Sequence, residues 1–253
     1  MNTMHLFAGA GGGLLADLIL GHIPVVAVEW DKNACRVLRD RAADGWFPGL
    51  HVHETDVRLF DPSDYAGRVD CIAAGFPCQD ISAAGKGAGI TGSRSGLVSE
   101  VFRSVDAVQP RYVFLENSPR IRTKGRHIVI GELVARGYAW RDGILGAADV
   151  GAPHQRDRWF CIAANADGMR QLQSQRSKCD EWGRPDYATK DAACAKPGAS
   201  GATWFETESG VGSLVYGVAD DVVPGAVKAL GNGQVPLQAA TAWMMLGGPG
   251  EIS

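Results

Sequence analysis

Residues 4–13 read MHLFAGAGGG, so an apolar run passes directly into a glycine-rich stretch. This order, followed by the largely apolar residues 12–20, predicts a buried strand that turns into a helix. Glycines at such a turn let backbone N–H groups approach a ligand closely. The stretch does not match the GxGxxG pattern, because Leu14 stands in place of the third glycine. The sequence therefore disfavours a dinucleotide site at this turn.

Short apolar runs and helical stretches alternate over the first two-thirds of the chain, which predicts an α/β fold with a doubly wound, mostly parallel sheet. The expected strands cover residues 4–7, 25–29, 51–55, 69–74, 112–116, 139–145 and 159–163. The expected helices cover residues 12–20, 33–42, 96–108 and 237–246. Residues 166–222 are rich in Gly, Ser, Thr, Asp and Lys, which predicts a small irregular domain. Residues 1–165 and 223–253 would then form the main domain.

Composition sets the broad class of the protein. The chain has 253 residues, of which 45% are hydrophobic and 21% charged, as in soluble globular proteins. The net charge of −3 does not by itself indicate a nucleic-acid binder, so such a protein must gather its positive residues on one face. The six cysteines form no CxxC pair, which predicts no metal site and a reduced, cytoplasmic setting. The apolar residues 5–28 lack a basic leader, so we interpret them as domain core and expect no membrane segment.

Acidic residues end two of the expected strands. Glu29 ends the second strand, where a carboxylate can accept hydrogen bonds from ribose hydroxyls. Asp56 ends the third strand and could meet the exocyclic amine of an adenine. Two ordinary surface acids beside a glycine-rich turn are the alternative. The placement of both acids at strand ends favours a nucleoside-containing cofactor.

The fourth expected strand runs into residues 75–80, which read GFPCQD. Cys78 thus lies just beyond the carboxyl end of a strand, where open α/β sheets bind ligands. Glu116 ends the next strand, and neighbouring strand ends converge on one crevice. A thiol nucleophile beside a carboxylic acid suits covalent catalysis on a ring that must also be protonated. Taken singly, a buried structural cysteine and a capping glutamate are the commoner outcomes.

Two arginines follow in residues 151–158, which read GAPHQRDR. Arg156 and Arg158 alternate, so on an extended strand their side chains point the same way. Two guanidinium groups on one face can clamp a phosphate or steady a polar base. A solvated basic edge is an equally good interpretation of this segment alone.

Together, these motifs resemble the DNA (cytosine-5)-methyltransferase family of bacteria and phages, from the first strand to the last helix. Each motif is only moderately specific, but seven in the family order are very specific. They are residues 7–12 (FAGAGG), Glu29 with Asp56, residues 75–79 (GFPCQ), 92–97 (GSRSGL), 116–117 (EN), 154–158 (HQRDR) and 230–236 (LGNGQVP). The family usually has other residues at Phe76, Ser118 and His154. The resemblance implies an S-adenosylmethionine-dependent methyltransferase fold, with residues 166–222 as a short target-recognition domain.

The resemblance also implies an activity and a set of site residues. The enzyme would transfer a methyl group from S-adenosyl-L-methionine to C5 of a flipped cytosine, through a bond between Cys78 and C6, and release S-adenosyl-L-homocysteine. Glu116 would contact the N3 and amino edge of the cytosine, supported by Arg158 with Arg156 nearby. The residues implied for the cofactor are Phe7, Ala8, Gly9, Gly11, Glu29, Trp30, Asp56, Val57, Pro77, Leu97 and Asn232.

The implied partner is double-stranded DNA, and we expect a monomer without a metal, functionally paired in some systems with a restriction endonuclease. The residues expected at the DNA are Gln79, Ser82, Lys86, Arg94, Arg120 and Arg122. Residues 80–94 are the candidate loop that closes over the flipped base. The basic run at residues 120–126 is either the positive face that DNA requires or a solvated charged loop.

Three other functions compete with this interpretation. A methyltransferase of the same fold could act on cytosine in RNA. A catalytically silent DNA-binding relative would be expected to lose Cys78, Glu116 or the glycines of the first turn, and this chain keeps all of them. A methyltransferase acting on small molecules would explain the cofactor motif, but not the Pro-Cys-Gln and Glu-Asn motifs.

Overall fold

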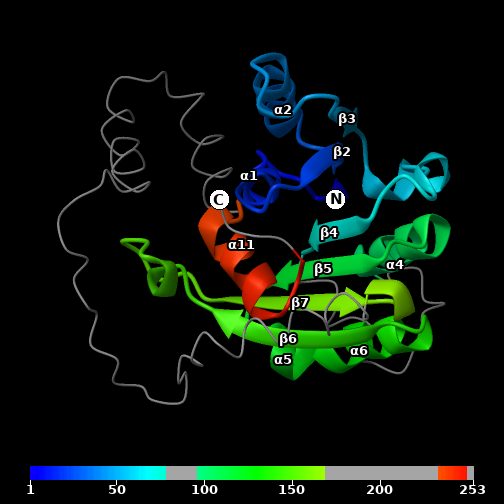
Figure 1. Cartoon of the computed structure of the whole chain (residues 1–253), viewed down its shortest axis with the longest axis vertical. Coiled ribbons are helices and arrows are strands. Elements are labelled where there is room, and N and C mark those ends of the chain that lie inside the picture. The colour runs from blue at the N-terminus through cyan, green and yellow to red at the C-terminus, as the bar shows by residue number, and fades with distance from the viewer. Residues whose placement is uncertain (78–95, 169–232, 250–253) are drawn as a thin grey trace.

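The computed structural model describes residues 1–77, 96–168 and 233–249. These residues form a seven-stranded sheet with the order β3-β2-β1-β4-β5-β7-β6 (Figure 1). The strands are β1 (Asn2–Leu6), β2 (Ile23–Glu29), β3 (His51–Glu54), β4 (Cys71–Gly75), β5 (Tyr112–Asn117), β6 (Ala139–Leu145) and β7 (Arg158–Ala164). All seven strands lie close to the expected ranges. The central strands β1, β4, β5 and β7 are mostly buried and read as apolar runs, as strands buried on both faces do.

The first five strands pair in parallel, whereas β7 pairs antiparallel with both β5 and β6. The prediction of a mostly parallel, doubly wound sheet is therefore confirmed. From β1 the chain moves outward to β2 and β3, and β4 then returns to the other side of β1. The strand order reverses between β1 and β4. In open α/β sheets the ligand-binding crevice lies at the carboxyl ends of the strands at such a reversal.

Helices cover both faces of the sheet. They are α1 (Gly12–Ile19), α2 (Lys32–Ala43), α4 (Val98–Val108), α5 (Ile121–Lys124), α6 (Arg126–Ala135) and α11 (Pro236–Met245). Short 3-10 turns lie at η1 (Val57–Leu59) and η2 (Ser63–Tyr65), both after β3, and at η4 (Ala148–Val150), after β6. None of the helices in the described ranges is long and apolar enough to cross a membrane.

Side chains alternate between the two faces along each strand, as a pleated sheet requires. In β4, Ile72 and Ala74 pack with the core residues of α4, α5 and α6. Cys71 and Ala73 face the other way and pack with residues of α1 and α11. Glu116 follows Phe114 in β5 and shares its face, so its carboxyl group lies on the side of the sheet covered by α1 and α11.

Helix α11 comes from the far end of the chain and packs against α1, directly after the first strand (Figure 1). Trp243 of α11 is buried against Tyr112 and Phe114 of β5, with ring centroids 5.7 and 5.3 Å away. An early helix, α1, and a late helix, α11, therefore pack together beside the central strands of the sheet. Residues 169–222 of the expected small domain lie outside the described residues, so the division into two domains remains a prediction.

Candidate active site

A crevice opens at the carboxyl ends of β1, β4 and β5, where the strand order reverses. It is lined by residues 5–9 and Gly13 from β1 and its turn, residues 73–75 from β4, Glu116 from β5, and Gly233 with Gln234. The sheet register places Gly75 directly beside Glu116 in the parallel pair of β4 and β5. The chain thus leads into Pro77 and Cys78 from a position next to the Glu116 carboxyl group.

The turn after β1 is backbone-strained at one position. Phe7 has a φ of 58°, which a side chain with a Cβ rarely adopts, and Gly9 and Gly11 also have positive φ values, at 54° and 101°. Such outliers persist where the surrounding structure enforces them, and they cluster at ligand sites. Gly9 donates its N–H to Oε2 of Glu29 at 2.8 Å, which fixes the turn to the end of β2.

Glu29 is buried at the end of β2 and organises the neighbouring backbone. Its Oε1 accepts hydrogen bonds from the N–H groups of Trp30 and Asp31, both at 2.9 Å. A carboxylate has about four lone-pair positions, so these bonds and the bond from Gly9 leave acceptor capacity for a ligand hydroxyl. The Trp30 side chain is 72% exposed beside it. The contact of Glu29 with a ribose remains a prediction. The three backbone hydrogen bonds already hold its carboxylate in place.

Asp56 lies at the end of the strand next to β2, as expected. It caps η1 by accepting a 2.9 Å hydrogen bond from the N–H of Arg58, and the Arg58 guanidinium also pairs with it. The hydrogen bonds from Arg58 lower the pKa of Asp56. The Val57 side chain is buried in the core, so a cofactor contact at that position would come from the backbone.

The described residues reach both ends of the segment that holds the expected nucleophile. Pro77 is exposed at one end, and Leu97 packs half-buried against the core at the other. Asn117 donates from Nδ2 to the carbonyl oxygen of Phe76 at 2.9 Å, which ties β5 to the backbone just before Pro77. The predicted residues Cys78, Gln79, Ser82, Lys86, Arg94 and Asn232 lie outside the described residues.

Glu116 and Arg158 form an ion pair across β5 and β7. Nε of Arg158 lies 2.8 Å from Oε1 of Glu116. Glu116 pairs with Phe160 in the antiparallel register, and Arg158 is the next residue along β7 on the same face. Burial raises the pKa of Glu116, against the opposing effects of Arg158, Arg156 and a hydrogen bond from Gln234. The Glu116 carboxyl group therefore loses its proton at a higher pH, nearer to neutral, than the carboxyl group of an ordinary glutamate.

Arg156 lies on the same side, as its alternation with Arg158 predicts. Its Nη2 donates to the carbonyl oxygen of Gly233 at 2.7 Å, which ties the segment before α11 to the crevice. Burial and the like charge of Arg158 lower the pKa of Arg156, while Glu116 opposes that shift. The structure thus brings Glu116, Arg156 and Arg158 together, as the sequence predicts.

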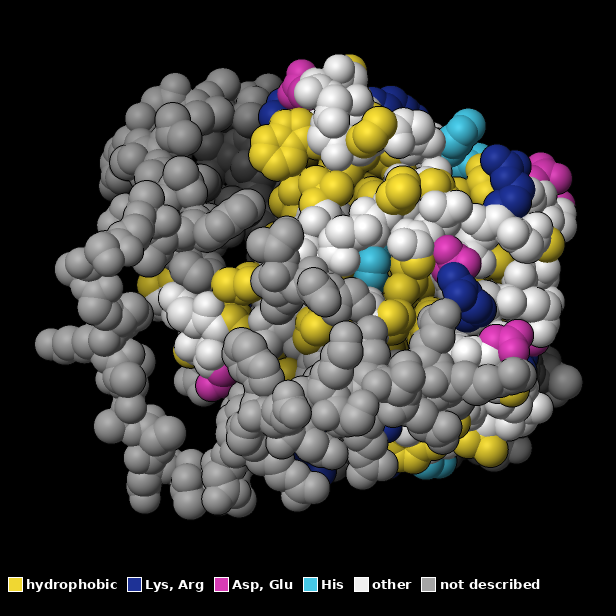
Figure 2. All heavy atoms as spheres, viewed as in Figure 1, with side chains coloured by type: hydrophobic (Ala, Val, Ile, Leu, Met, Phe, Trp, Pro, Cys, Tyr) yellow, Lys and Arg dark blue, Asp and Glu magenta, His cyan; other side chains and the backbone are white. Residues whose placement is uncertain are grey.

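The expected basic run separates into two parts. Arg120 and Arg122 are exposed after β5, where they remain candidates for phosphate contacts. Arg126 instead pairs with Asp142 of β6 through two hydrogen bonds and lies over the ring of Trp140. On the face seen in Figure 2, basic and acidic side chains are interspersed over the coloured residues. Within this run, Arg120 and Arg122 are therefore the exposed candidates for phosphate contacts, and the positive face remains a prediction.

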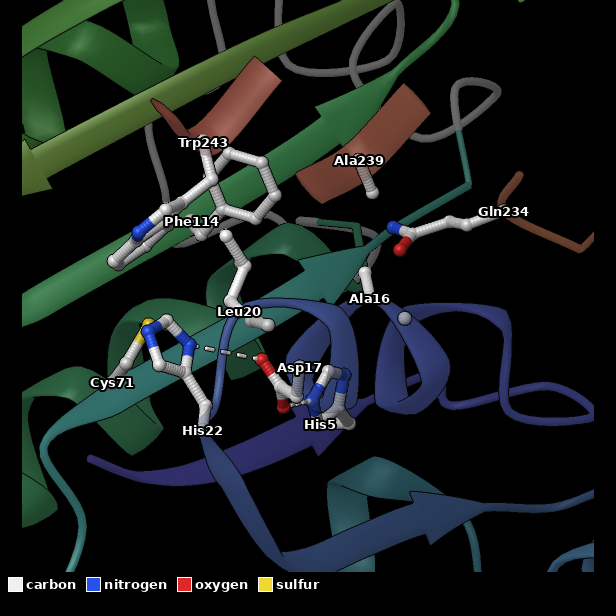
Figure 3. Close-up of a pocket in the computed structure, with 12 residues that line it drawn as sticks. His5, Ala16, Asp17, Leu20, His22, Cys71, Phe114, Gln234, Ala239 and Trp243 are labelled. Carbon is white, nitrogen blue, oxygen red and sulfur yellow. Dashed lines mark hydrogen bonds and ion pairs between the residues drawn. The ribbon is translucent and has the colours of Figure 1, made fainter. Parts of the chain in front are cut away.

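Sequence reasoning missed a buried polar cluster behind the crevice. Asp17 of α1 lies 2.6 Å from Nε2 of His5, accepts a hydrogen bond from Thr3, and faces Nδ1 of His22 at 3.4 Å (Figure 3). The other ring nitrogen of His22 lies 3.1 Å from the carbonyl oxygen of Pro249. The signal in the sequence was the pair of polar residues, His5 and Asp17, inside an otherwise apolar strand and helix.

Among the described residues, no group of three or more His, Cys, Asp or Glu side chains could hold a metal ion. The side chains that gather at the crevice are instead an acid, two guanidinium groups and an amide. Such a set can hold a polar ring and exchange a proton with it.

Comparisons with known proteins agree with this geometry. The profile of the C-5 cytosine-specific DNA methylase family matches residues 1–193. The chain is 35% identical over 167 residues to the Type II methyltransferase M.CviJI of Paramecium bursaria Chlorella virus IL3A, which covers 65% of this chain and 43% of the viral protein. It is 31% identical over 222 residues to M2.BsuMI of Bacillus subtilis, which covers 84% of this chain and 53% of that protein. The chain spans about half the length of these curated relatives.

Solved structures show the same fold. A putative DNA modification methyltransferase encoded within an Escherichia coli prophage is 28% identical, with a TM-score of 0.53 over 66% of this chain and 47% of that one. The DNMT2 protein of Spodoptera frugiperda is 22% identical, with a TM-score of 0.52 over 65% and 50%, which supports the fold alone. From the family match over most of its length, together with the site geometry, we conclude that this chain belongs to the C-5 cytosine-specific DNA methylase family.

Proposed function

We propose that this chain transfers a methyl group from S-adenosyl-L-methionine to C5 of cytosine in double-stranded DNA and releases S-adenosyl-L-homocysteine. One observation carries the proposal. A largely buried carboxyl group, Glu116, lies at the crevice beside the strand that leads into Cys78, and Arg158 holds one of its oxygens. The nucleophile would thus enter the site next to the one buried acid among the residues that line the crevice.

Features of the first turn suit a nucleoside cofactor. The left-handed Phe7 and Gly9 expose backbone at the mouth of the crevice, and a Cβ at Gly9 would meet no other atom within 4 Å. Glu29 offers acceptor capacity for ribose hydroxyls at the end of β2, and Asp56 follows at the end of β3. When bound, S-adenosyl-L-methionine supplies an electrophilic methyl group. We therefore assign Phe7, Gly9, Glu29 and Asp56 to its cleft.

The reaction needs a nucleophile and an acid because cytosine C5 is a poor nucleophile. In the proposed mechanism the thiolate of Cys78 adds to C6, and Glu116 donates a proton to N3, which offsets the negative charge that develops on the ring. C5 then carries the electron pair that takes up the methyl group. Removal of the C5 proton by a base, departure of the Cys78 thiolate and return of the N3 proton to the Glu116 carboxylate restore the ring.

The environment of Glu116 suits this acid role. Burial raises the pKa of Glu116, so a larger share of the carboxyl groups is protonated at neutral pH than in an exposed glutamate. Arg158 stabilises the carboxylate that remains after the proton is donated, and Arg156 lies nearby. The two arginines therefore stabilise Glu116 in the charged form that exists after the proton has been transferred.

The target base must leave the DNA stack, because C6 is unreachable within a duplex, at a cost of a few kcal/mol. We propose that the exposed Arg120 and Arg122, close after Glu116 in the chain, contact phosphates beside the flipped nucleotide. We further propose that Gln79, Ser82, Lys86 and Arg94 contact the DNA from the segment after Cys78. We also propose that the enzyme acts as a monomer and is functionally paired in some systems with a restriction endonuclease.

Bisulfite sequencing tests the proposal. Genomic DNA from a methylation-free host that expresses the chain should contain protected cytosines in one sequence context. Cys78→Ala should abolish the protection while the purified variant still binds S-adenosyl-L-methionine in calorimetry. Protection that persists in Cys78→Ala would show that another residue is the nucleophile. If a wild-type chain that binds the cofactor protects no cytosine, DNA is not the substrate, and transfer RNA is the next acceptor to assay.

A further inference from the structure

The residues of the first turn do more than face the crevice. A Cβ added to Gly12 would overlap the backbone carbonyl of Gln234, and one added to Gly13 would lie 2.7 Å from Oε1 of the Gln234 side chain. Real Cβ atoms essentially never approach another atom so closely. Two glycines at the start of α1 therefore form a seat for Gln234, which arrives from the other end of the chain just before α11.

A third glycine completes this seat beside Glu116. A Cβ at Gly75 would lie 2.9 Å from Oε2 of Glu116 and 3.3 Å from Nε2 of Gln234. The amide nitrogen of Gln234 and the second oxygen of Glu116 thus converge over the Cα of Gly75, where Gln234 forms a side-chain hydrogen bond with Glu116. Arg158 holds Oε1 of the same carboxyl group. Oε1 of Glu116 therefore lies beside Arg158, and Oε2 lies on the side of Gln234.

The other end of the Gln234 amide points toward the buried polar cluster (Figure 3). Nδ1 of His5 would lie 3.0 Å from the same Cβ position on Gly13 that the amide oxygen approaches. His5 is anchored from behind, because its Nε2 lies 2.6 Å from the buried carboxylate of Asp17. The amide oxygen thus lies on the His5 side and the amide nitrogen on the Glu116 side. In that orientation the nitrogen can donate to a carboxylate.

The backbone of the segment is fixed as well. The carbonyl oxygen of Gly233 accepts the 2.7 Å hydrogen bond from Arg156. One turn into α11, the buried Gln238 donates to the carbonyl oxygens of Leu145 and Arg156, each at 2.7 Å. The backbone of Gln234 therefore lies between two anchored points, Gly233 and Gln238.

We infer that Gln234 is a positioning residue, whose amide N–H group fixes the second oxygen of Glu116 from a seat made by Gly12, Gly13 and Gly75. The inference deepens the proposed function, since Glu116 is there the acid that meets the cytosine. Gln234 acts on the orientation and protonation of Glu116 and has no part in bond making. Arg158 and Gln234 together hold the carboxyl group from two sides.

A donor to the carboxylate stabilises its charged form, so its removal favours the protonated form. The titratable or charged groups that face Glu116 from the described elements are Arg158 of β7 and Arg156 before it, with His5 of β1 beyond the amide. Replacement of Gln234 by an apolar residue leaves these groups in place. The titration of Glu116 in such a variant thus reports the amide itself.

The experiment is a carboxyl titration by 13C NMR of the full chain, labelled at glutamate side chains and measured without DNA or cofactor. Loss of one signal in Glu116→Gln assigns Glu116. In Gln234→Met, which nearly keeps the side-chain volume, we expect the Glu116 midpoint to move to higher pH. An unchanged midpoint in a folded Gln234→Met protein would overturn the inference. If that variant does not fold, Gln234→Asn is measured instead, since it keeps the amide but withdraws it by one methylene. A Glu116 midpoint that moves to higher pH in this variant supports the inference, and an unchanged midpoint overturns it.

A matched control separates positioning from packing. Gln238→Met removes another buried amide from the same segment, so it should lower the thermal midpoint and leave the Glu116 titration in place. A shift of similar size in Gln238→Met would mean that any loosening of α11 moves Glu116, and the specific role of Gln234 would be rejected. Because the titration needs no substrate, it remains decisive even if the proposed methylation is not found.

An activity measurement adds an independent readout once methylation is established. Gln234→Met should lower kcat, move the alkaline limb of the pH profile of kcat to higher pH, and leave KM for S-adenosyl-L-methionine unchanged. The limb moves in this direction because loss of the proton from Glu116 ends its role as the acid. A lower kcat with an unmoved limb would indicate a purely structural role.

Discussion

The guanidinium of Arg158 lies 2.8 Å from Oε1 of Glu116, although one residue begins β7 and the other nears the end of β5. The antiparallel pairing of these strands makes the contact possible, since it turns the start of β7 toward the carboxyl end of β5. In an otherwise parallel sheet, the reversed direction of β7 therefore places the guanidinium of Arg158 at the crevice.

Arg158→Leu should reduce kcat about 100-fold, because it leaves a buried carboxylate without its closest cation. Arg158→Lys should lose about tenfold, since an ammonium group keeps the charge but not the planar geometry of the guanidinium. Steady-state methyl transfer measures both variants. Arg39→Leu is the control, because it removes an ion pair with Glu54 from a more exposed position at the edge strand β3. Equal losses in Arg158→Leu and Arg39→Leu would contradict the role assigned to the ion pair.

Glu29→Ala should raise the dissociation constant for S-adenosyl-L-methionine at least about tenfold. The substitution removes the expected ribose acceptor and also releases the N–H groups of Gly9, Trp30 and Asp31. Isothermal titration calorimetry measures the change. Glu54→Ala, at the paired position of the neighbouring strand β3, provides a matched control that should bind normally. Unchanged affinity in Glu29→Ala would reject the ribose assignment.

Gly12→Ala should destabilise the chain by about 2 kcal/mol, because its methyl group would overlap the backbone of Gln234 and push α11 from α1. Chemical denaturation measures the loss, and limited proteolysis should show earlier cleavage near α11. Gly131→Ala, within α6 and with open space around it, should instead stabilise by about 0.5–1 kcal/mol. If both substitutions had the same effect, the close approach of Gln234 to Gly12 would carry no energetic weight.

Asp17→Asn should destabilise the fold by roughly 2 kcal/mol at neutral pH. Burial would raise the pKa of Asp17, but the charge of His5 and the hydrogen bonds from His22, His5 and Thr3 outweigh it and lower the pKa from 3.8 to about 2. The folded-state pKa lies below the unfolded value, so the stabilisation is present above the unfolded pKa and disappears as the pH falls through about 2.

Denaturation curves of wild type and Asp17→Asn at a series of pH values check this dependence. The gap in unfolding free energy should be full at neutral pH and shrink as the pH falls through the carboxyl range. Asp44→Asn, which removes an exposed i,i+3 pair with Arg41, should change the stability by less than about 0.5 kcal/mol at every pH. A gap for Asp17→Asn that stays constant down to the acid limit would argue against the charge of Asp17 as its source.

The strands and most helices could be predicted from sequence because buried parallel strands read as short apolar runs between helical patterns. The run at 112–116 became β5 and the run at 139–145 became β6. Strand order and direction were harder to predict. The antiparallel entry of β7 between β5 and β6 depends on a short connection through η4, and the apolar pattern of β7 is the same for either direction.

The grouping of Glu116 with Arg156 and Arg158 could be predicted because polar residues at strand ends stand out from apolar surroundings. The side-chain partner of each of these residues could not be predicted, since the contact between Arg158 and Glu116 depends on the β5–β7 register. Gln234 belongs to the motif at residues 230–236, but its contact with Glu116 could not be predicted, because a glutamine next to a glycine turn has many ordinary roles. Gly12 and Gly13 were interpreted through ligand approach and Gly75 only as part of the GFPCQ motif, yet each also makes room for Gln234 or Glu116.

The contact between α1 and α11 joins the beginning of the chain to its far end, and this has a consequence for synthesis on the ribosome. The glycine turn and Glu116 emerge early, whereas Gln234 emerges much later. A nascent chain that stops before Gln234 can form much of the sheet but cannot place this donor beside Glu116. Synthesis of Gln234 and α11, rather than formation of the sheet, is therefore the step at which both oxygens of Glu116 gain their partners.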